Sequence, residues 1–348
     1  MNATNRLGGL QSLRGIAAFA VLFQHVTFYV CTAKGIDYAP YLRIDFGRFG
    51  VQLFFVLSGF VMAGCMAQGR RFLWNRVLRI YPAYWLSLIV SAVLLAAPVF
   101  DWRFDWQSAL LIPSTELNNS YRVPYWTLVY EMTFYVVTYG IVLAGGKRVA
   151  TTVCLVWLAA IAVTFKYVPI SYFSPGALIL FSKWNVYFIV GMLTALNIDA
   201  LRRLNSTALG VFSIAGWSIG ESLANVAPLG SDFVIGAAFA MLVVLAIGAR
   251  AVRPLDRFGD YSFGVYLLHV PIIVLFMDVL GPVASTFRLG FLWAATMLVA
   301  IAGSTAFGWF EHRIHGALKR MLAAPRRYAV TVTAQSEESS QPHSRPAP

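Results

Sequence analysis

Two ionisable residues interrupt an apolar stretch near the start of the chain, "LRGIAAFAVLFQH", which covers residues 13–25. On a helix that turns 100° per residue, Arg14 and His25 point in directions about 20° apart and lie about 16.5 Å apart along the axis. An imidazole can take a proton from a hydroxyl, so His25 is a candidate general base. Its alternative role is a neutral ring that hydrogen-bonds another helix. Arg14 either reaches the membrane boundary or lines a polar channel.

A carboxylate lies at a similar predicted depth in another apolar stretch, "YWTLVYEMTFYVV". Glu131 is six residues past Tyr125, where this stretch begins, and His25 is six residues before Cys31, where the first stretch ends. A carboxylate next to an imidazole would orient the ring and fix its tautomer. Glu131 is therefore a candidate catalytic partner of His25, and the alternative is a structural buried ion pair.

Two arginines occur one helical turn apart in "RRFLWNRVLRIYPAYW". Arg76 and Arg79 are spaced i, i+3 and so face the same side of a helix. A guanidinium donates two parallel hydrogen bonds to a phosphate, which makes the pair a candidate anion site. Arginines on the cytoplasmic side of a span are also what membrane topology alone produces.

Three further residues are candidates for substrate contact or for a structural polar role. His269 lies in "FGDYSFGVYLLHVP", two residues before a proline, where it is either a ligand or a partner of a helix kink. Trp126 ends an aromatic-rich segment near 101–126, which is typical of a sugar-stacking platform or of an interfacial aromatic belt. Tyr81 directly follows the arginine pair.

The elements that must position these residues are membrane helices. The chain has 348 residues, of which 59% are hydrophobic and 12% charged, far from the profile of a soluble domain. We predict an all-α, polytopic helix bundle of about ten transmembrane spans. The predicted spans are 9–31, 47–68, 80–99, 125–145, 149–166, 176–196, 207–221, 231–249, 261–281 and 289–310.

The distribution of basic residues predicts the orientation of the bundle. The net charge is +12, and most Lys and Arg residues fall in segments on the same side as the N-terminus. By the positive-inside rule, both termini are then cytoplasmic. The same rule explains the basic composition without a nucleic-acid partner.

We predict one membrane domain over residues 1–321 and a disordered cytoplasmic tail over 322–348, which is rich in Ser, Pro and Gln. The three cysteines lack metal-ligand spacing, so no metal is expected. Nucleotide-binding (G-x-x-x-x-G-K-[ST]) and zinc-protease (H-E-x-x-H) motifs do not occur in the sequence.

Several of these motifs, in this order, resemble the acyltransferase 3 family of integral-membrane O-acyltransferases. The resemblance runs from residue 10 to about 315 and includes Arg-x10-His, "FGVQLFFVLSGFVMA", Arg-x-x-Arg, "YWTLVYEMTFY" and "FGDYSFGVYLLHVP". Within the family, the chain most resembles the exopolysaccharide O-acetyltransferases, which share its plan of a membrane domain with a short tail.

The resemblance implies transfer of an acyl group, most often acetyl, from cytoplasmic acetyl-CoA to a glycan hydroxyl. It implies His25 as the catalytic base with Glu131 as its partner, and Arg14, Arg76 and Arg79 as coenzyme A ligands. The implied setting is the bacterial cytoplasmic (inner) membrane, with membrane lipids around the protein. The implied partners are a glycan or lipid-linked oligosaccharide acceptor and polysaccharide biosynthesis machinery.

Three other functions compete with this interpretation. A proton-coupled transporter or flippase would use His25, Glu131 and His269 as a relay. Within the family, the acyl group could be succinyl or longer, or the acceptor could be something other than a polysaccharide. A structural membrane scaffold leaves the buried charges unexplained.

Overall fold

The computed structural model describes residues 3–95, 105–115, 119, 121–168, 170, 175–249 and 252–323. The described part is helical and contains no strand. Its α-helices are α1 (Ala3–Ala33), α2 (Phe46–Cys65), α3 (Arg71–Leu94), α4 (Asp105–Ala109), α5 (Trp126–Ala144), α6 (Gly146–Tyr167), α7 (Asn185–Leu196), α8 (Ile198–Leu201), α9 (Ser206–Leu223), α10 (Pro228–Gly248), α11 (Arg253–Leu280) and α12 (Leu289–Ala323). Short 3-10 helices are η1 (Met66–Gln68), η2 (Gly176–Phe181) and η3 (Gly281–Thr286).

The all-α membrane fold predicted from composition is confirmed. Among the described residues, eight helices are long and apolar enough to cross a membrane: α1, α2, α3, α5, α6, α10, α11 and α12. The predicted span 207–221 corresponds to the 18-residue helix α9, and the predicted span 176–196 is broken into η2 and α7. The tail beyond residue 323 and residues 101–104 of the aromatic segment lie outside the described residues.

The break in the sixth predicted span coincides with a buried charge. Lys183 lies between η2 and α7, and its Nζ is 3.1 Å from Asp232 Oδ2 of α10. Tyr187 donates to the other oxygen of Asp232 at 2.5 Å, and Gln52 of α2 donates to Tyr187 at 2.5 Å. A lysine inside the bundle thus has a carboxylate partner, as an apolar surrounding requires.

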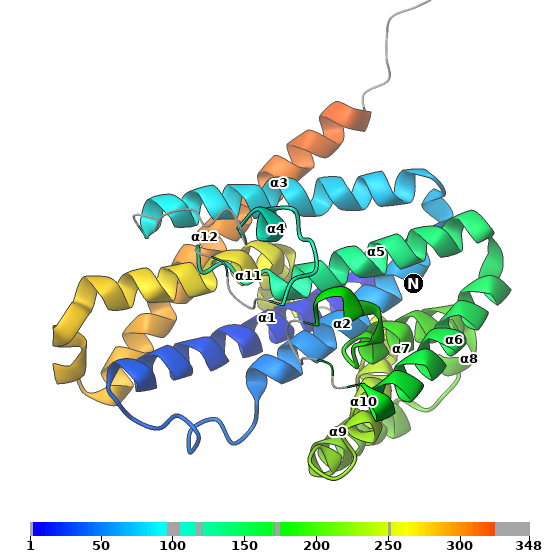
Figure 1. The fold of residues 1–348 in the computed structure, drawn as a ribbon, viewed down its shortest axis with the longest axis horizontal. Coiled ribbons are helices and arrows are strands. Elements are labelled where there is room, and N and C mark those ends of the chain that lie inside the picture. The colour runs from blue at the N-terminus through cyan, green and yellow to red at the C-terminus, as the bar shows by residue number, and fades with distance from the viewer. Residues whose placement is uncertain are drawn as a thin grey trace, which may run out of the picture.

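Helix α1 is the centre of the bundle, since it packs against α2, α10, α11 and α12. Figure 1 shows α1 and α2 crossing the middle of the molecule, with α3 along the upper edge and α9 and α10 below. Asp45 defines the start of α2, because its side chain accepts a hydrogen bond from the backbone N–H of Arg48. The chain therefore turns back beside α1 and brings the first turn of α2 close to the second half of α1.

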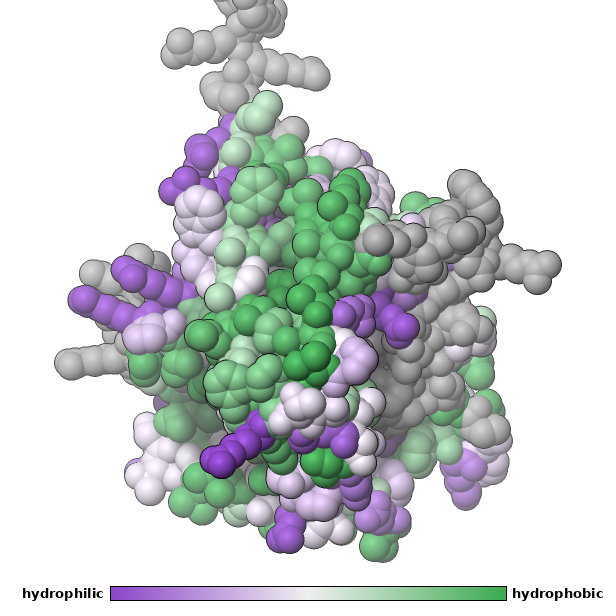
Figure 2. Space-filling view, turned by 90° about the vertical axis from the view of Figure 1, so that its left-hand side faces the viewer, coloured by the Kyte–Doolittle hydropathy of each residue, from purple (hydrophilic) through white to green (hydrophobic). Residues whose placement is uncertain are grey.

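Large apolar side chains cover much of the outside of the helices. Val93, Ile214 and Leu298 are examples, each with 70% or more of its surface exposed. Figure 2 looks at the left-hand end of Figure 1 and shows apolar side chains gathered along the middle of this face, with hydrophilic ones around them. Exposed apolar surface of this extent fits helices that face lipid.

Glycines set the closest helix contacts. A Cβ at Gly59 of α2 would lie 1.9 Å from the carbonyl oxygen of Phe188 in α7, and one at Gly191 would lie 2.0 Å from that of Val56. The two backbones meet directly at these positions, as small residues permit in membrane helices. Gly140 of α5, by contrast, has nothing within 4 Å of the place a Cβ would take.

We therefore expect Gly59→Ala to destabilise the protein by about 1–3 kcal/mol, because α2 and α7 would have to separate. Gly140→Ala is the matched control and is expected to be neutral or slightly stabilising. Thermal unfolding of the purified protein in detergent, followed by gel filtration, measures both. Equal melting temperatures for the two variants would contradict the close contact.

Candidate active site

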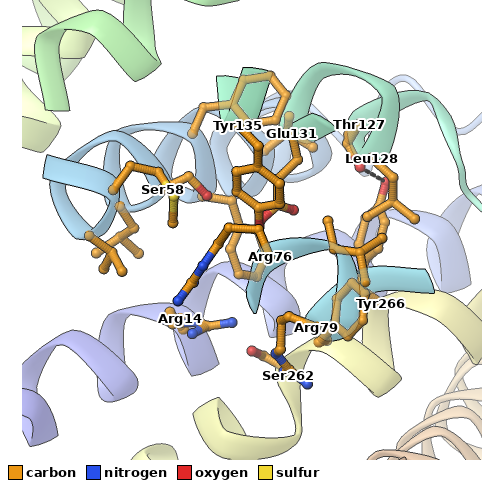
Figure 3. Close-up of a pocket in the computed structure, with 18 residues that line it drawn as sticks. Arg14, Ser58, Arg76, Arg79, Thr127, Leu128, Glu131, Tyr135, Ser262 and Tyr266 are labelled. Carbon is orange, nitrogen blue, oxygen red and sulfur yellow. Dashed lines mark hydrogen bonds between the residues drawn. The ribbon is translucent and has the colours of Figure 1, made fainter. Parts of the chain in front are cut away.

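Two of the cavities inside the bundle are lined by candidate residues from the sequence analysis that come from several helices, and the first is rich in arginine. This arginine cavity, of about 120 Å³, is defined here by Arg14, Arg76, Arg79, Glu131, Tyr135 and Ser262. These residues come from α1, α3, α5 and α11. Figure 3 shows the three guanidinium groups turned toward one another across the cavity. Arg14 of α1 and Arg76 of α3 are 62 residues apart along the chain. The fold thus brings together the three arginines that the sequence singled out.

The arginines of α3 have different surroundings. Arg79 forms an ion pair with Glu311 of α12, a carboxylate that is only 2% exposed, and its guanidinium lies 4.9 Å from the centre of the Phe263 ring. Arg76 lies 6.0 Å from the Phe72 ring, and its buried Nε has no hydrogen-bond partner. Arg79 is therefore fixed in place by the protein, whereas Arg76 keeps donors for a ligand.

Glu131 lies with the arginines and does not contact His25. Its Oε1 accepts a hydrogen bond from the hydroxyl of Tyr135, one turn further along α5. The predicted pairing of Glu131 with His25 is absent, because equal depth on two helices does not fix the direction in which each side chain points. The carboxylate instead faces the positive charges of the arginine cavity, which is a favourable place for it.

The second cavity contains His25. This histidine cavity, of about 310 Å³, is defined here by His25, Gln24, Tyr29, Asp45, Arg48, Arg122, Trp126 and Trp184. Its polar groups come from the second half of α1, the start of α2 and the loop before α5. Arg48 is paired with Glu221 of α9. Trp126 and Trp184 form an aromatic wall, with ring centres 5.3 Å apart.

The two cavities meet at Val51 and Tyr266, the two residues that line both. The hydroxyl of Tyr266 accepts a hydrogen bond from Thr127 at 2.6 Å, drawn in Figure 3. This bond connects α11 to α5 beside the junction. These two residues, Val51 and Tyr266, are called the shared wall here, because they border both the arginine cavity and the cavity that contains His25.

His25 is held by its own helix and by a second histidine. Its Nδ1 is 2.8 Å from the carbonyl oxygen of Val21 and 3.4 Å from Nε2 of His269. A carbonyl oxygen only accepts, so Nδ1 carries the proton and Nε2 of His25 is left with a free lone pair. An imidazole in this tautomer, at the edge of a cavity, can accept a proton from a hydroxyl.

Of the other candidates from the sequence, one lines a cavity and two do not. Trp126 lines the histidine cavity. Tyr81 lines neither cavity, since its hydroxyl donates to the carbonyl of Leu110 at 2.7 Å and its ring lies 5.2 Å from that of Trp85. Tyr81 is therefore a structural residue that joins α3 to the segment after α4. His269 also lines neither cavity and is 1% exposed.

Sequence reasoning missed Glu311, Tyr135 and the shared wall. Glu311 directly precedes the basic run "HRIH" and falls past the predicted last span, so it resembles an ordinary cytoplasmic residue. The signal that could have identified it is the continuation of α12 for thirteen residues beyond the predicted end of that span. In the described part of the chain, no three His, Cys, Asp or Glu side chains form a group that could hold a metal ion.

Comparison with known proteins identifies the family. Residues 7–310 match the sequence model of the acyltransferase 3 family, described as an acyltransferase domain. The chain belongs to this family. The acyltransferase MdmB of Streptomyces mycarofaciens is 24% identical, with 77% of this chain and 79% of the relative covered. No solved structure matches.

Membership of the acyltransferase 3 family makes the protein a multi-pass membrane acyltransferase. The matched range contains both cavities and the shared wall, and Glu311 is the first residue after it. The two cavities are therefore parts of the acyltransferase domain itself.

The Arg79–Glu311 ion pair gives a test of the arginine cavity. Arg79→Met leaves a buried carboxylate without its cation and should cost about 3–5 kcal/mol of stability. The double variant Arg79→Met/Glu311→Met removes both charges and should be clearly more stable than Arg79→Met alone. Arg76→Met, which breaks no ion pair seen among the described residues, is the control and should cost less. Thermal unfolding in detergent measures all three, and a double variant that is no more stable than Arg79→Met would contradict the pairing.

Proposed function

We propose that the protein transfers an acyl group, acetyl in the simplest case, from acyl-CoA to a hydroxyl of an exported or lipid-linked glycan. The observation that supports this most directly is the division of the site. Three arginines line one cavity, His25 lines the other, and the two residues of the shared wall line both. A donor that carries phosphates at one end and a thioester at the other matches this division.

The arginine cavity suits the anionic end of the donor. Guanidinium groups bind phosphate oxygens through paired hydrogen bonds, and Arg76 and Arg14 have no ion pair within the described residues. The pantetheine arm of coenzyme A is long and thin. It would pass between Val51 and Tyr266 and bring the thioester toward His25, about 16.5 Å along α1 from Arg14.

The chemistry assigned to His25 is general-base catalysis. As the acceptor oxygen attacks the thioester carbonyl, His25 Nε2 takes the hydroxyl proton. A C–O bond forms and the C–S bond breaks. The proton then passes to the leaving sulfur, which gives an ester and free coenzyme A. Direct attack or an acyl-histidine is favoured over an acyl-serine or acyl-cysteine intermediate, because no Ser or Cys among the described residues lines the histidine cavity.

The histidine cavity suits a sugar acceptor. Trp126 and Trp184 offer aromatic faces on which a sugar ring can stack, while Asp45 and Arg122 offer polar contacts to hydroxyls. With both termini cytoplasmic, Arg14 lies toward the cytoplasm and His25 toward the outside. The setting proposed is therefore the bacterial cytoplasmic membrane, where cytoplasmic acetyl-CoA and an exported glycan reach opposite ends of the site. The polysaccharide biosynthesis machinery would supply that glycan.

His25→Ala is expected to lower transfer by about 10²–10⁴-fold, because the general base is lost. The O-acetyl ester content of the host's exported polysaccharide in a deletion strain, complemented with each variant, measures it. His312→Ala is the control, since His312 is exposed and lines neither cavity. Esters that are unchanged by the deletion would refute the acceptor, and full complementation by His25→Ala would refute the role of His25.

Two donors test the arginine cavity. Arg76→Ala should raise KM for acetyl-CoA by about tenfold or more, because a hydrogen-bonded contact to a charged phosphate is lost. S-acetylpantetheine lacks the phosphates, so its KM should be the same for Arg76→Ala and wild type. Release of coenzyme A or pantetheine by purified protein gives both constants. Equal losses with the two donors would mean that Arg76 does not contact a phosphate.

A further inference from the structure

The contact between His25 and His269 has no place in the reaction described so far. The two rings lie 4.9 Å apart, edge to face, and Nε2 of His269 is 3.4 Å from Nδ1 of His25. His269 is 1% exposed and lines neither cavity. It therefore touches no substrate bound there, and any effect it has on the reaction acts through His25.

Hydrogen-bond partners fix the tautomers of both rings. Nδ1 of His269 lies 2.7 Å from the carbonyl oxygen of Tyr266 and 3.2 Å from that of Val265. Both carbonyls only accept, so Nδ1 of His269 is protonated and its Nε2 has a free lone pair. That lone pair lies 3.4 Å from Nδ1 of His25, whose one proton it shares with the closer carbonyl oxygen of Val21.

Close helix packing sets the level at which the two rings meet. A Cβ at Gly15 of α1 would lie 2.5 Å from the carbonyl oxygen of Leu255, and one at Gly259 of α11 would lie 1.9 Å from that of Gln11. Both helices run the same way from this contact. Each reaches its histidine after ten residues, about 15 Å of helix. The rigid contact at the glycines thus places the two rings side by side.

We propose that His269 is a positioning residue that holds His25 for catalysis by accepting, together with the carbonyl oxygen of Val21, a shared hydrogen bond from its Nδ1–H. This inference rests on the proposed role of His25 as the base. When Nε2 of His25 takes the hydroxyl proton, the ring becomes a cation and its Nδ1–H becomes a stronger donor. The lone pair of His269 then stabilises that cation. It does so without placing a second charge in the apolar surrounding, where a carboxylate would be costly.

Two variants separate this role from the local bond of His269 to its own helix. Glutamine places an acceptor near the position of Nε2, so His269→Gln keeps the contact to His25. Asparagine places its amide near the position of Nδ1, so His269→Asn keeps the bond to Tyr266 and loses the contact. A residue needed only for its own helix would show the opposite order.

The first measurement is independent of transfer. Purified variants are treated with diethyl pyrocarbonate, which modifies an unprotonated imidazole nitrogen, and labelling of His25 is followed by mass spectrometry with exposed His312 as the reference. We expect His25 in His269→Gln to label at the wild-type rate and His25 in His269→Asn to label several-fold more slowly. Equal rates in wild type and His269→Asn would overturn the inference.

The second measurement is transfer from acetyl-CoA to de-esterified host polysaccharide. His269→Asn should lower kcat by about tenfold with KM unchanged, the equivalent of one hydrogen bond, while His269→Gln stays within about threefold of wild type. Similar losses in both variants, or a change confined to KM, would refute a positioning role. If His25→Ala transfers normally, the proposed base fails, and the labelling result still decides whether His269 holds His25.

Discussion

An ionisable side chain inside a membrane has to find its partner within the protein, because lipid offers none. The internal contacts of this protein follow from that constraint. Lys183 has Asp232, Arg79 has Glu311, Arg48 has Glu221, and Glu131 faces the arginines. Each partner comes from a different helix or from a distant turn. The same pairs that satisfy the charges therefore also hold the helices in their arrangement.

Histidine satisfies the constraint in another way. His25 and His269 each donate a hydrogen bond from Nδ1–H to carbonyl oxygens of their own helices. Neither ring is paired with a carboxylate among the described residues, and the Nε2 lone pair of His25 is left available. The arginine cavity thus gathers three guanidinium groups around Glu131, while the other cavity combines His25 with Asp45, Arg48 and Arg122. The anionic donor and the hydroxyl acceptor proposed above need different electrostatic surroundings, and the two cavities differ in this way.

Helical periodicity and charge were enough to predict the membrane bundle and several of its site residues. The 20° offset between Arg14 and His25 correctly placed both on the inner face of α1, and the i, i+3 spacing correctly placed Arg76 and Arg79 together. The assignment of His25 as a base stays a prediction. Periodicity gives the face of one helix, which is why these local relations were accessible.

Relations between helices were not accessible in this way. The pairing of Glu131 with His25 was wrong, because depth along the membrane says nothing about rotation of one helix relative to another. The partner of Arg79 lies 232 residues away, and Tyr81 turned out to bond a loop carbonyl. Such contacts depend on which helices are neighbours, and a single sequence does not contain that information.

The ten-residue spacing from Gly15 to His25, and from Gly259 to His269, has a consequence for how this chain can change. Removing one residue from either stretch would rotate its histidine by about 100° and withdraw it by 1.5 Å. The partner ring would then face an aliphatic side chain. The two stretches are thus tied in length, so that an insertion or deletion in one is tolerated only with a matching change in the other. Both stretches can therefore change by substitution, whereas neither can change in length on its own.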